Sequence, residues 1–144
     1  MEEVVLIDAG PIVALLIARD QYHGWAKAEW ARLKPPFLCC EAVLSEAQHI
    51  VRRLGGDPLV ILEFVRRGLI EVSFRAEPEI EALIELERSY ADVPMSLADA
   101  CLVRMSELLP RCRVMTTDSD FLVYRRNRRQ VIPVICPPEL KNSA

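Results

Sequence analysis

The stretch Val4-Val5-Leu6-Ile7-Asp8-Ala9-Gly10-Pro11 decides the fold class, because it predicts a strand that passes directly into a helix. Val4–Ile7 is an uninterrupted apolar run that is too short for a helix, so it predicts a buried strand. Pro11 is pre-set for the first turn of a helix, which we expect to run to about Arg19. Asp8 stands at the junction, at the carboxyl end of the strand.

The rest of the chain repeats this alternation of short apolar strands and helices. It predicts strands at 37–39, 69–74, 112–115 and 131–134, and helices at 21–33, 57–68, 77–90 and 96–109. A further helix carries Val43 to Leu54, and 119–124 form a helical turn. This order predicts a parallel α/β sheet with right-handed crossovers, in a single domain of residues 1–136. Residues 137–144, which begin with two prolines, are expected to form a frayed tail.

Composition limits the class of protein. The 144 residues fit one domain with a real core, and 51% of them are hydrophobic, which predicts a homodimer or a tightly bound partner. The chain has no apolar run of about 18 residues, so we expect no membrane span. The start Met1-Glu2-Glu3 is acidic where a secretory signal is basic, so we expect a cytoplasmic protein.

Five cysteines are an odd number, and they include no Cys-x-x-Cys pair, so buried free thiols are expected rather than a zinc site. The net charge of −3 does not indicate nucleic-acid binding, but the basic residues are mostly arginines and they cluster. The planar guanidinium suits phosphate, so one cluster is a candidate substrate-binding surface, and a solvated turn is the alternative. That cluster consists of Arg125, Arg126, Arg128 and Arg129.

Four acidic segments place a carboxylate where an apolar strand or helix meets a loop or a helix start. They are Ile7-Asp8-Ala9-Gly10-Pro11, Leu44-Ser45-Glu46, Met95-Ser96-Leu97-Ala98-Asp99-Ala100 and Thr116-Thr117-Asp118-Ser119-Asp120-Phe121. Sites in parallel sheets form beyond the carboxyl ends of the strands, where gathered carboxylates repel one another unless a hard cation neutralises them. An all-oxygen set suits Mg²⁺ or Mn²⁺ rather than zinc. The pattern therefore predicts a divalent-metal enzyme that acts on a phosphodiester.

Each carboxylate also has a purely structural interpretation. Asp8 can cap the helix that follows it, and Ser96-Leu97-Ala98-Asp99 matches a capping box. Glu46 can be an exposed glutamate on a helix, whereas Asp118 and Asp120 stand where turn residues are expected. A cap uses only part of the hydrogen-bonding capacity of a carboxylate, so the two roles are compatible.

Other catalytic motifs are missing or incomplete. Glu46-Ala47-Gln48-His49 is a Glu-x-x-His pair as used in di-iron bundles, but the other histidine, His23, has no glutamate three residues before it. Asp8 lacks the second aspartate, two residues on, that an aspartyl-phosphate phosphatase uses. The sequence has no P-loop, nucleophile elbow or dinucleotide-binding fingerprint. These classes are excluded.

The chain resembles the PIN domain, and most closely the VapC-like toxin ribonucleases of bacterial and archaeal toxin–antitoxin pairs. The similarity covers nearly the whole chain and begins with Leu6-Ile7-Asp8-Ala9-Gly10-Pro11-Ile12-Val13-Ala14-Leu15. Its most specific part runs from Tyr90-Ala91-Asp92-Val93-Pro94-Met95-Ser96-Leu97-Ala98-Asp99-Ala100 into Val114-Met115-Thr116-Thr117-Asp118-Ser119-Asp120-Phe121. One departure is Ala9, where many relatives place Ser or Thr.

The resemblance implies a three-layer α/β/α sandwich with a central, mainly parallel sheet. It also implies Mg²⁺- or Mn²⁺-dependent endonucleolytic cleavage of RNA that leaves 5′-phosphate and 3′-hydroxyl ends, and control by an antitoxin protein. The catalytic and metal-binding residues that it implies are Asp8, Glu46, Asp99 and Asp118. The supporting residues that it implies are Thr116 and Asp120. Two alternatives are a PIN-like nuclease of RNA maturation and a catalytically silent PIN-like scaffold that binds RNA or protein.

Overall fold

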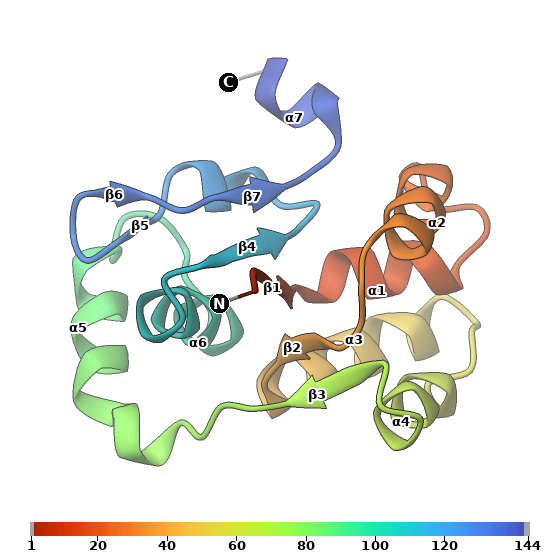
Figure 1. Ribbon diagram of the computed structural model, residues 1–144, viewed down its shortest axis with the longest axis horizontal. Coiled ribbons are helices and arrows are strands. Elements are labelled where there is room, and N and C mark those ends of the chain that lie inside the picture. Colours follow the sequence, from red (N-terminus) through yellow and green to blue (C-terminus); the bar gives the residue numbers. More distant parts are fainter. Residues whose placement is uncertain (1, 143–144) are drawn as a thin grey trace.

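The computed structural model describes residues 2–142, which form a three-layer α/β/α sandwich (Figure 1). Its central sheet has five strands in the order β3-β2-β1-β4-β7, and every neighbouring pair is parallel. The central strand β1 pairs with β2 on one side and β4 on the other, so that Leu6 lies beside both Leu38 and Val114. The strands are β1 (Val4–Ile7), β2 (Phe37–Cys39), β3 (Ile70–Val72), β4 (Cys112–Met115) and β7 (Val134–Ile135).

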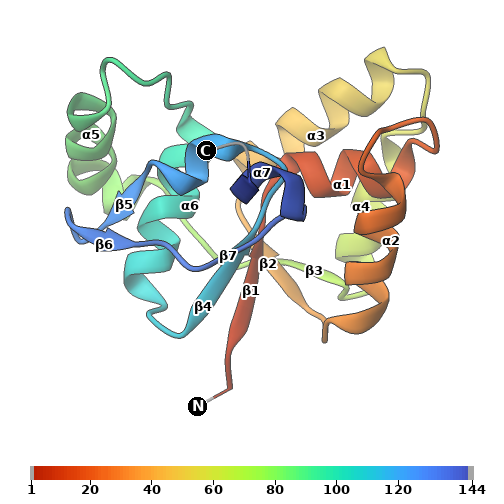
Figure 2. The same ribbon diagram turned by 90° about the horizontal axis from the view of Figure 1, so that it is seen from above.

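The helices cover the two faces of this sheet (Figure 2). On one side lie α1 (Ala9–Leu16), α2 (His23–Arg32), α3 (Glu41–Arg53) and α4 (Leu59–Arg66). On the other side lie α5 (Ile80–Ser89) and α6 (Leu97–Leu108). Short 3-10 helices occur at η1 (Glu77–Glu79) and η2 (Ser119–Leu122). The chain thus winds outward from β1 in one direction and then returns to build β4 and β7, which makes the β1–β4 junction the topological switch point.

Local sequence signals set several element ends. Ser96 caps α6 in a capping box, as predicted, and Asp57 accepts a hydrogen bond from the Leu59 amide before α4. Gly55 follows α3 with φ of +87°, a conformation that costs a glycine little. The predicted strands at 4–7, 37–39 and 112–115 are confirmed with the same bounds.

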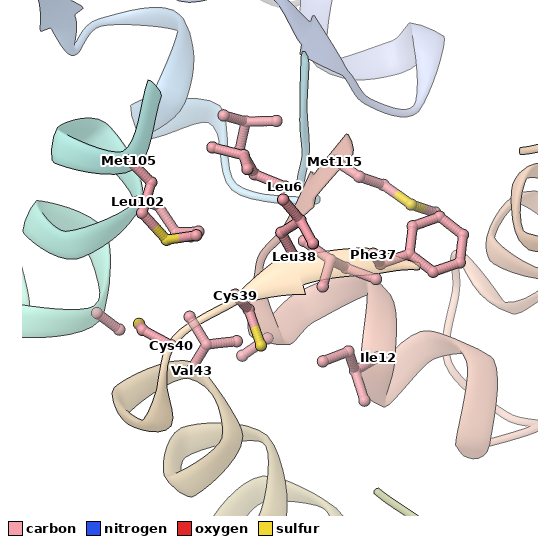
Figure 3. Close-up of a cluster of buried hydrophobic side chains, with 14 of the residues drawn as sticks. Leu6, Ile12, Phe37, Leu38, Cys39, Cys40, Val43, Leu102, Met105 and Met115 are labelled. Carbon is pink, nitrogen blue, oxygen red and sulfur yellow. The ribbon is translucent and has the colours of Figure 1, made fainter. Parts of the chain in front are cut away.

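The hydrophobic core lies on both faces of the sheet. In Figure 3, Leu102 and Met105 reach the sheet from α6, whereas Ile12 reaches it from α1. Leu6 and Ile12 are fully buried, and burial of such a side chain contributes about 1.5–3 kcal/mol to stability. The core extends to α2, where the rings of Trp30 and Phe37 stack with centroids 4.5 Å apart.

One predicted strand is wrong. Residues 131–134 do not form a single strand, because Pro133 has no amide hydrogen to donate to a ladder. The chain instead forms an antiparallel hairpin of β5 (Arg125–Arg126) and β6 (Gln130–Val131), followed by β7. Residues 127–129 form its turn, in which Asn127 and Arg128 have positive φ values of 50° and 70°.

The C-terminal segment was expected to be a frayed tail. Within it, Pro138–Asn142 form the short helix α7, which contacts η2. Residues 143–144 lie outside the described residues. Across residues 2–142, no helix is long and apolar enough to cross a membrane.

Candidate active site

The sequence-predicted acidic residues project from elements that meet at the switch point between β1 and β4. Asp8 follows β1, Asp118 follows β4, and Asp99 lies in the first turn of α6. Figure 2 shows α1 leaving the end of β1 and α6 beginning close to the same edge. The Asp8 amide donates to the Met115 carbonyl at 3.0 Å, which extends the β1–β4 pairing as far as the first carboxylate.

Asp8 is buried and held by two hydrogen bonds. Its Oδ1 accepts from the Ala9 amide at 2.8 Å, and its Oδ2 accepts from the Thr116 hydroxyl at 2.8 Å. Burial raises the pKa of Asp8 to about 7, against the opposing effect of these hydrogen bonds, and the charges of Asp99 and Glu46 raise it further. The hydrogen bond from the Ala9 amide confirms that Asp8 caps α1. The Asp8 carboxylate also interacts electrostatically with Asp99 and Glu46.

Thr116 joins two of the acidic residues. Its hydroxyl donates to Asp8 and accepts from the Asp118 amide at 2.9 Å, so one buried side chain fixes the spacing of two loops. Asp118 Oδ1 in turn accepts from the Asp120 amide at 2.9 Å, which begins η2. The turn interpretation of Asp118 is thus also confirmed.

Asp99 forms the capping box considered from the sequence, and its carboxylate also faces a second hydroxyl group. Its amide donates to Ser96 Oγ at 3.1 Å, and its Oδ2 accepts from the Ser96 amide at 3.4 Å, which completes the capping box. The same Oδ2 lies 3.1 Å from the Tyr124 hydroxyl. Burial raises the pKa of Asp99 despite these hydrogen bonds, and the charge of Asp118 adds to the increase.

Glu46 and Asp120 complete the group of carboxylates. Glu46 lies on an exposed part of α3, where partial desolvation and the charges of Asp99 and Asp118 raise its pKa. Partial burial, followed by the charge of Asp118, raises the pKa of Asp120. Asp8, Glu46, Asp99 and Asp118 therefore share one electrostatic environment, although they come from four separate parts of the chain.

The donor chemistry of this group fits a hard divalent cation. All four side chains offer carboxylate oxygens, and their mutual repulsion is what a bound cation relieves. Within residues 2–142, no three or more acidic, histidine or cysteine side chains form a cage that could hold a metal ion as they stand. Mg²⁺ keeps several waters and takes only one or two carboxylates directly, so its binding does not require such a cage.

Tyr124 is a residue of this site that the sequence reasoning missed. Its side chain is fully buried, and its ring packs edge-on against Phe121 and Tyr90 with centroids 5.2 and 5.1 Å away. A buried tyrosine hydroxyl needs a hydrogen-bond partner, but the sequence does not show that Asp99 supplies it.

The candidate substrate-binding arginines have two different environments. Arg125 donates to the carbonyls of residues 122, 123 and 124, and Arg126 donates to those of Ser106 and Pro110. Ser106 lies in the last turn of α6, about 10 Å along the helix from Asp99, and Pro110 follows the end of the helix. Arg128 and Arg129 are exposed, so the substrate-binding prediction now concerns mainly these two.

Comparison with solved structures finds the toxin VapC20 of Mycobacterium tuberculosis, whose crystal structure is that of a sarcin–ricin loop cleaving toxin. The two structures agree with a TM-score of 0.76 over 90% of this chain and 99% of VapC20. The fold is PIN-like. The sequences are 21% identical, so the similarity to VapC20 establishes the architecture. No protein-family model and no curated protein sequence matches this chain.

Proposed function

We propose that this protein is a Mg²⁺- or Mn²⁺-dependent endoribonuclease and the cytoplasmic toxin of a toxin–antitoxin pair. The observation that carries the proposal is the electrostatic coupling of Asp8, Glu46, Asp99 and Asp118 at the switch point of a PIN-like sheet. Repulsion among carboxylates destabilises an apo protein, so their gathering at a sheet edge favours a cation-binding role over a structural one.

These four carboxylates are the residues that would hold the metal. When bound, the metal supplies Lewis-acid polarisation of the phosphate and lowers the pKa of a water, which becomes the nucleophile. Thr116 keeps the Asp8 carboxylate oriented through its hydroxyl, and Tyr124 does the same for Asp99. Asp120 adds negative charge beside Asp118 but would not itself hold the metal. No side chain of this chain needs to form a covalent intermediate.

The proposed partners are RNA, an antitoxin protein and a second copy of the chain. VapC20 is a sarcin–ricin loop cleaving toxin, so a sarcin–ricin stem-loop is the first defined substrate to test. Protein partners are supported by large apolar side chains on the surface. Leu59 and Leu62 of α4 are 63% and 46% exposed, and Ile80 and Ile84 of α5 are 46% and 44% exposed.

The test is cleavage of RNA by the purified protein with Mg²⁺, with Mn²⁺ and with a chelator. The substrates are a sarcin–ricin stem-loop and a mixed pool of structured RNAs. We expect metal-dependent cutting that Asp8→Asn and Asp99→Asn reduce to background. Little loss of fold is expected, because asparagine is a good cap at position 8 and matches the size of aspartate at position 99. Ser96→Ala is the matched control, because it removes the cap of α6 but retains the Asp99 carboxylate.

The outcomes separate the candidate functions. Equal losses in Ser96→Ala and Asp99→Asn would assign Asp99 to the cap alone. Absence of cutting together with a rise of the melting temperature in Mn²⁺ would indicate a selective nuclease whose RNA was not in the panel. Absence of both responses would contradict the proposal and favour a catalytically silent scaffold.

A further inference from the structure

A cavity of about 540 Å³ lies between α5, α6 and the hairpin of β5 and β6. These three elements lie together at one end of the molecule (Figure 1, Figure 2). The volume falls in the range of about 300–1,000 Å³ that is typical of small-ligand sites. One face of α5 forms a wall of the cavity through residues at helical spacing, and the hairpin supplies two arginines. The cavity therefore combines a helix wall and an arginine-bearing wall.

Tyr90 connects this cavity to the candidate active site. It lines the cavity, and its ring packs edge-on against Tyr124 with the centroids 5.1 Å apart. The Tyr124 hydroxyl lies 3.1 Å from Oδ2 of Asp99. The ring of Tyr124 thus separates Tyr90 from a carboxylate that is proposed to hold the metal. This position suits a nucleotide that neighbours the cleaved phosphodiester.

The hairpin wall carries positive charge that no acidic side chain neutralises. Arg104, in the α6 wall, donates to the carboxylates of Glu79 and Glu107 and is therefore compensated. Arg125 uses Nη1 to donate to three main-chain carbonyls, which hold its guanidinium in one orientation. Within residues 2–142, neither Arg125 nor Arg128 forms an ion pair. Two guanidinium groups remain for an anion, and their planar fork suits phosphate.

Glu85 supplies the opposite charge from α5. Its main-chain carbonyl accepts from the Ser89 hydroxyl at 2.8 Å, but its carboxylate has no hydrogen bond or ion pair in the part of the chain that the structure describes. An ionised carboxylate only accepts hydrogen bonds, so it selects a base edge that donates. The Watson–Crick edge of guanine has two adjacent donors, N1–H and the 2-amino group, whereas each other base has one donor group. Two parallel donors match the two oxygens of a carboxylate.

We propose that this cavity binds a guanine nucleotide of the RNA substrate, with the base edge on Glu85 and the phosphate on Arg125 and Arg128. The proposal rests on the proposed function, because the nucleotide belongs to the RNA that the carboxylates would cut. Sequence-specific proteins commonly take up single unstacked RNA bases and read their Watson–Crick edges in this way. Glu85 is then a specificity residue, and the cavity determines where the nuclease cuts.

The first experiment titrates single nucleotides into ¹⁵N-labelled protein in chelator and follows the amide signals by NMR. The probes are 5′-GMP, 5′-AMP, 5′-CMP, 5′-UMP, inosine monophosphate and guanosine. We expect 5′-GMP to move the amide signals of Glu85, Ser89 and Arg128 and to bind roughly tenfold more tightly than the other three standard nucleotides. Inosine monophosphate lacks the 2-amino group and guanosine lacks the phosphate, so both should bind more weakly than 5′-GMP. Equal binding of the four standard nucleotides, or no shift at these amides, would overturn the proposal.

Two variants test the two halves of the site. Glu85→Gln should lower the affinity for 5′-GMP to that of the other nucleotides, because glutamine cannot accept both guanine donors. Arg128→Ala should weaken binding of all the nucleotides by a similar factor and leave guanosine unaffected. The matched controls are Glu81→Gln and Arg88→Ala, which change exposed charges of α5 that do not line the cavity. Equal losses in Glu85→Gln and Glu81→Gln would reduce the effect to the net charge of α5 and contradict the assignment.

Mapping of the cut sites separates this proposal from the proposed function. In the mixed RNA pool we expect guanine to be enriched at a fixed distance from the cut, and this enrichment should disappear in Glu85→Gln. Cutting without guanine enrichment and without 5′-GMP binding would overturn the proposal and leave the nuclease intact. Binding of 5′-GMP in a protein that cuts no RNA would contradict the proposed function and assign the cavity to free guanine nucleotides instead of RNA.

Discussion

The hydroxyl of Tyr124 lies 3.1 Å from Oδ2 of Asp99 and 2.8 Å from the carbonyl oxygen of Pro94. One hydroxyl proton cannot serve both acceptors at once, so the two oxygens compete for it. The Tyr124 ring is fully buried, which holds its hydroxyl between the loop before α6 and the carboxylate of Asp99 in the first turn of α6. Tyr124 is thus placed to hold Asp99 in one orientation.

Tyr124→Phe tests this positioning role, because it keeps the ring packing and removes the hydroxyl. We expect a loss of about 1–2 kcal/mol of stability and roughly tenfold slower cleavage, with a higher Mn²⁺ concentration needed for half-maximal rate. The measurements are urea unfolding and a cleavage rate against Mn²⁺ concentration. Tyr90→Phe is the control, since the Tyr90 hydroxyl accepts from the Arg125 amide. If Tyr124→Phe needs the same Mn²⁺ concentration for half-maximal rate as the wild type, Tyr124 has only a structural role.

Thr116→Val tests the link between Asp8 and Asp118. The change removes the donor to Asp8 and the acceptor for the Asp118 amide while it keeps the volume of a buried side chain. We expect a loss of about 1–3 kcal/mol of stability because buried polar groups lose their partner, together with slower cleavage. Thr116→Ser keeps the hydroxyl and should retain most of the activity. Equal effects of the two substitutions would assign the loss to packing instead of hydrogen bonding.

Strands and helix caps were the features that the sequence predicted best, because their causes are local. The strands at 4–7 and 112–115 are short apolar runs between clear turn signals, and they occur as predicted. The capping box at Ser96 and Asp99 depends on residues three apart, so it too is visible in the sequence. The hydroxyl of Thr116 and the carboxylate of Asp8 were placed together by resemblance, and they do form a hydrogen bond.

Other features depend on tertiary packing and could not be predicted from the sequence. The hairpin of β5 and β6 requires positive φ at Asn127 and Arg128, and arginine gives no local signal for that conformation. The internal hydrogen bonds of Arg126 reach Ser106, which is 20 residues away in the chain. Tyr124 and Asp99 are 25 residues apart, and their contact follows from how η2 sits beside α6. Contacts between residues so far apart in the sequence arise from the way the helices and strands pack, which local sequence patterns do not encode.

The raised pKa of Asp8 predicts how the stability of the metal-free protein depends on pH. The pKa of Asp8 is about 7 in the folded protein, against 3.8 for an ordinary aspartate, so the folded state holds this proton more tightly. Its contribution to stability is fully present below about pH 4 and is lost as the pH rises through about 7. The loss is at most about 4 kcal/mol, since each pKa unit corresponds to roughly 1.4 kcal/mol.

The measurement is urea unfolding in chelator at several pH values between 5 and 8. We expect the free energy of unfolding to fall across this range in the wild type and to fall less in Asp8→Asn, which has no charge to gain at this position. Added Mn²⁺ should stabilise the wild type more at the upper end of the range, because metal binding displaces the proton. Parallel pH profiles for the two proteins would contradict the assignment to Asp8.

The exposed arginines of the hairpin make the salt dependence of RNA binding informative. For single-stranded RNA, each lost phosphate contact reduces the steepness of log binding constant against log salt concentration by about 0.7. The double variant Arg128→Ala with Arg129→Ala should therefore reduce it by about 1.4. Fluorescence anisotropy of a labelled RNA, in chelator to prevent cleavage, gives this slope. The control is Arg66→Ala with Arg67→Ala, a similarly exposed pair at the end of α4. An unchanged slope in the hairpin variant, or an equal change in the α4 variant, would make the hairpin arginines a solvated turn with no specific part in RNA binding.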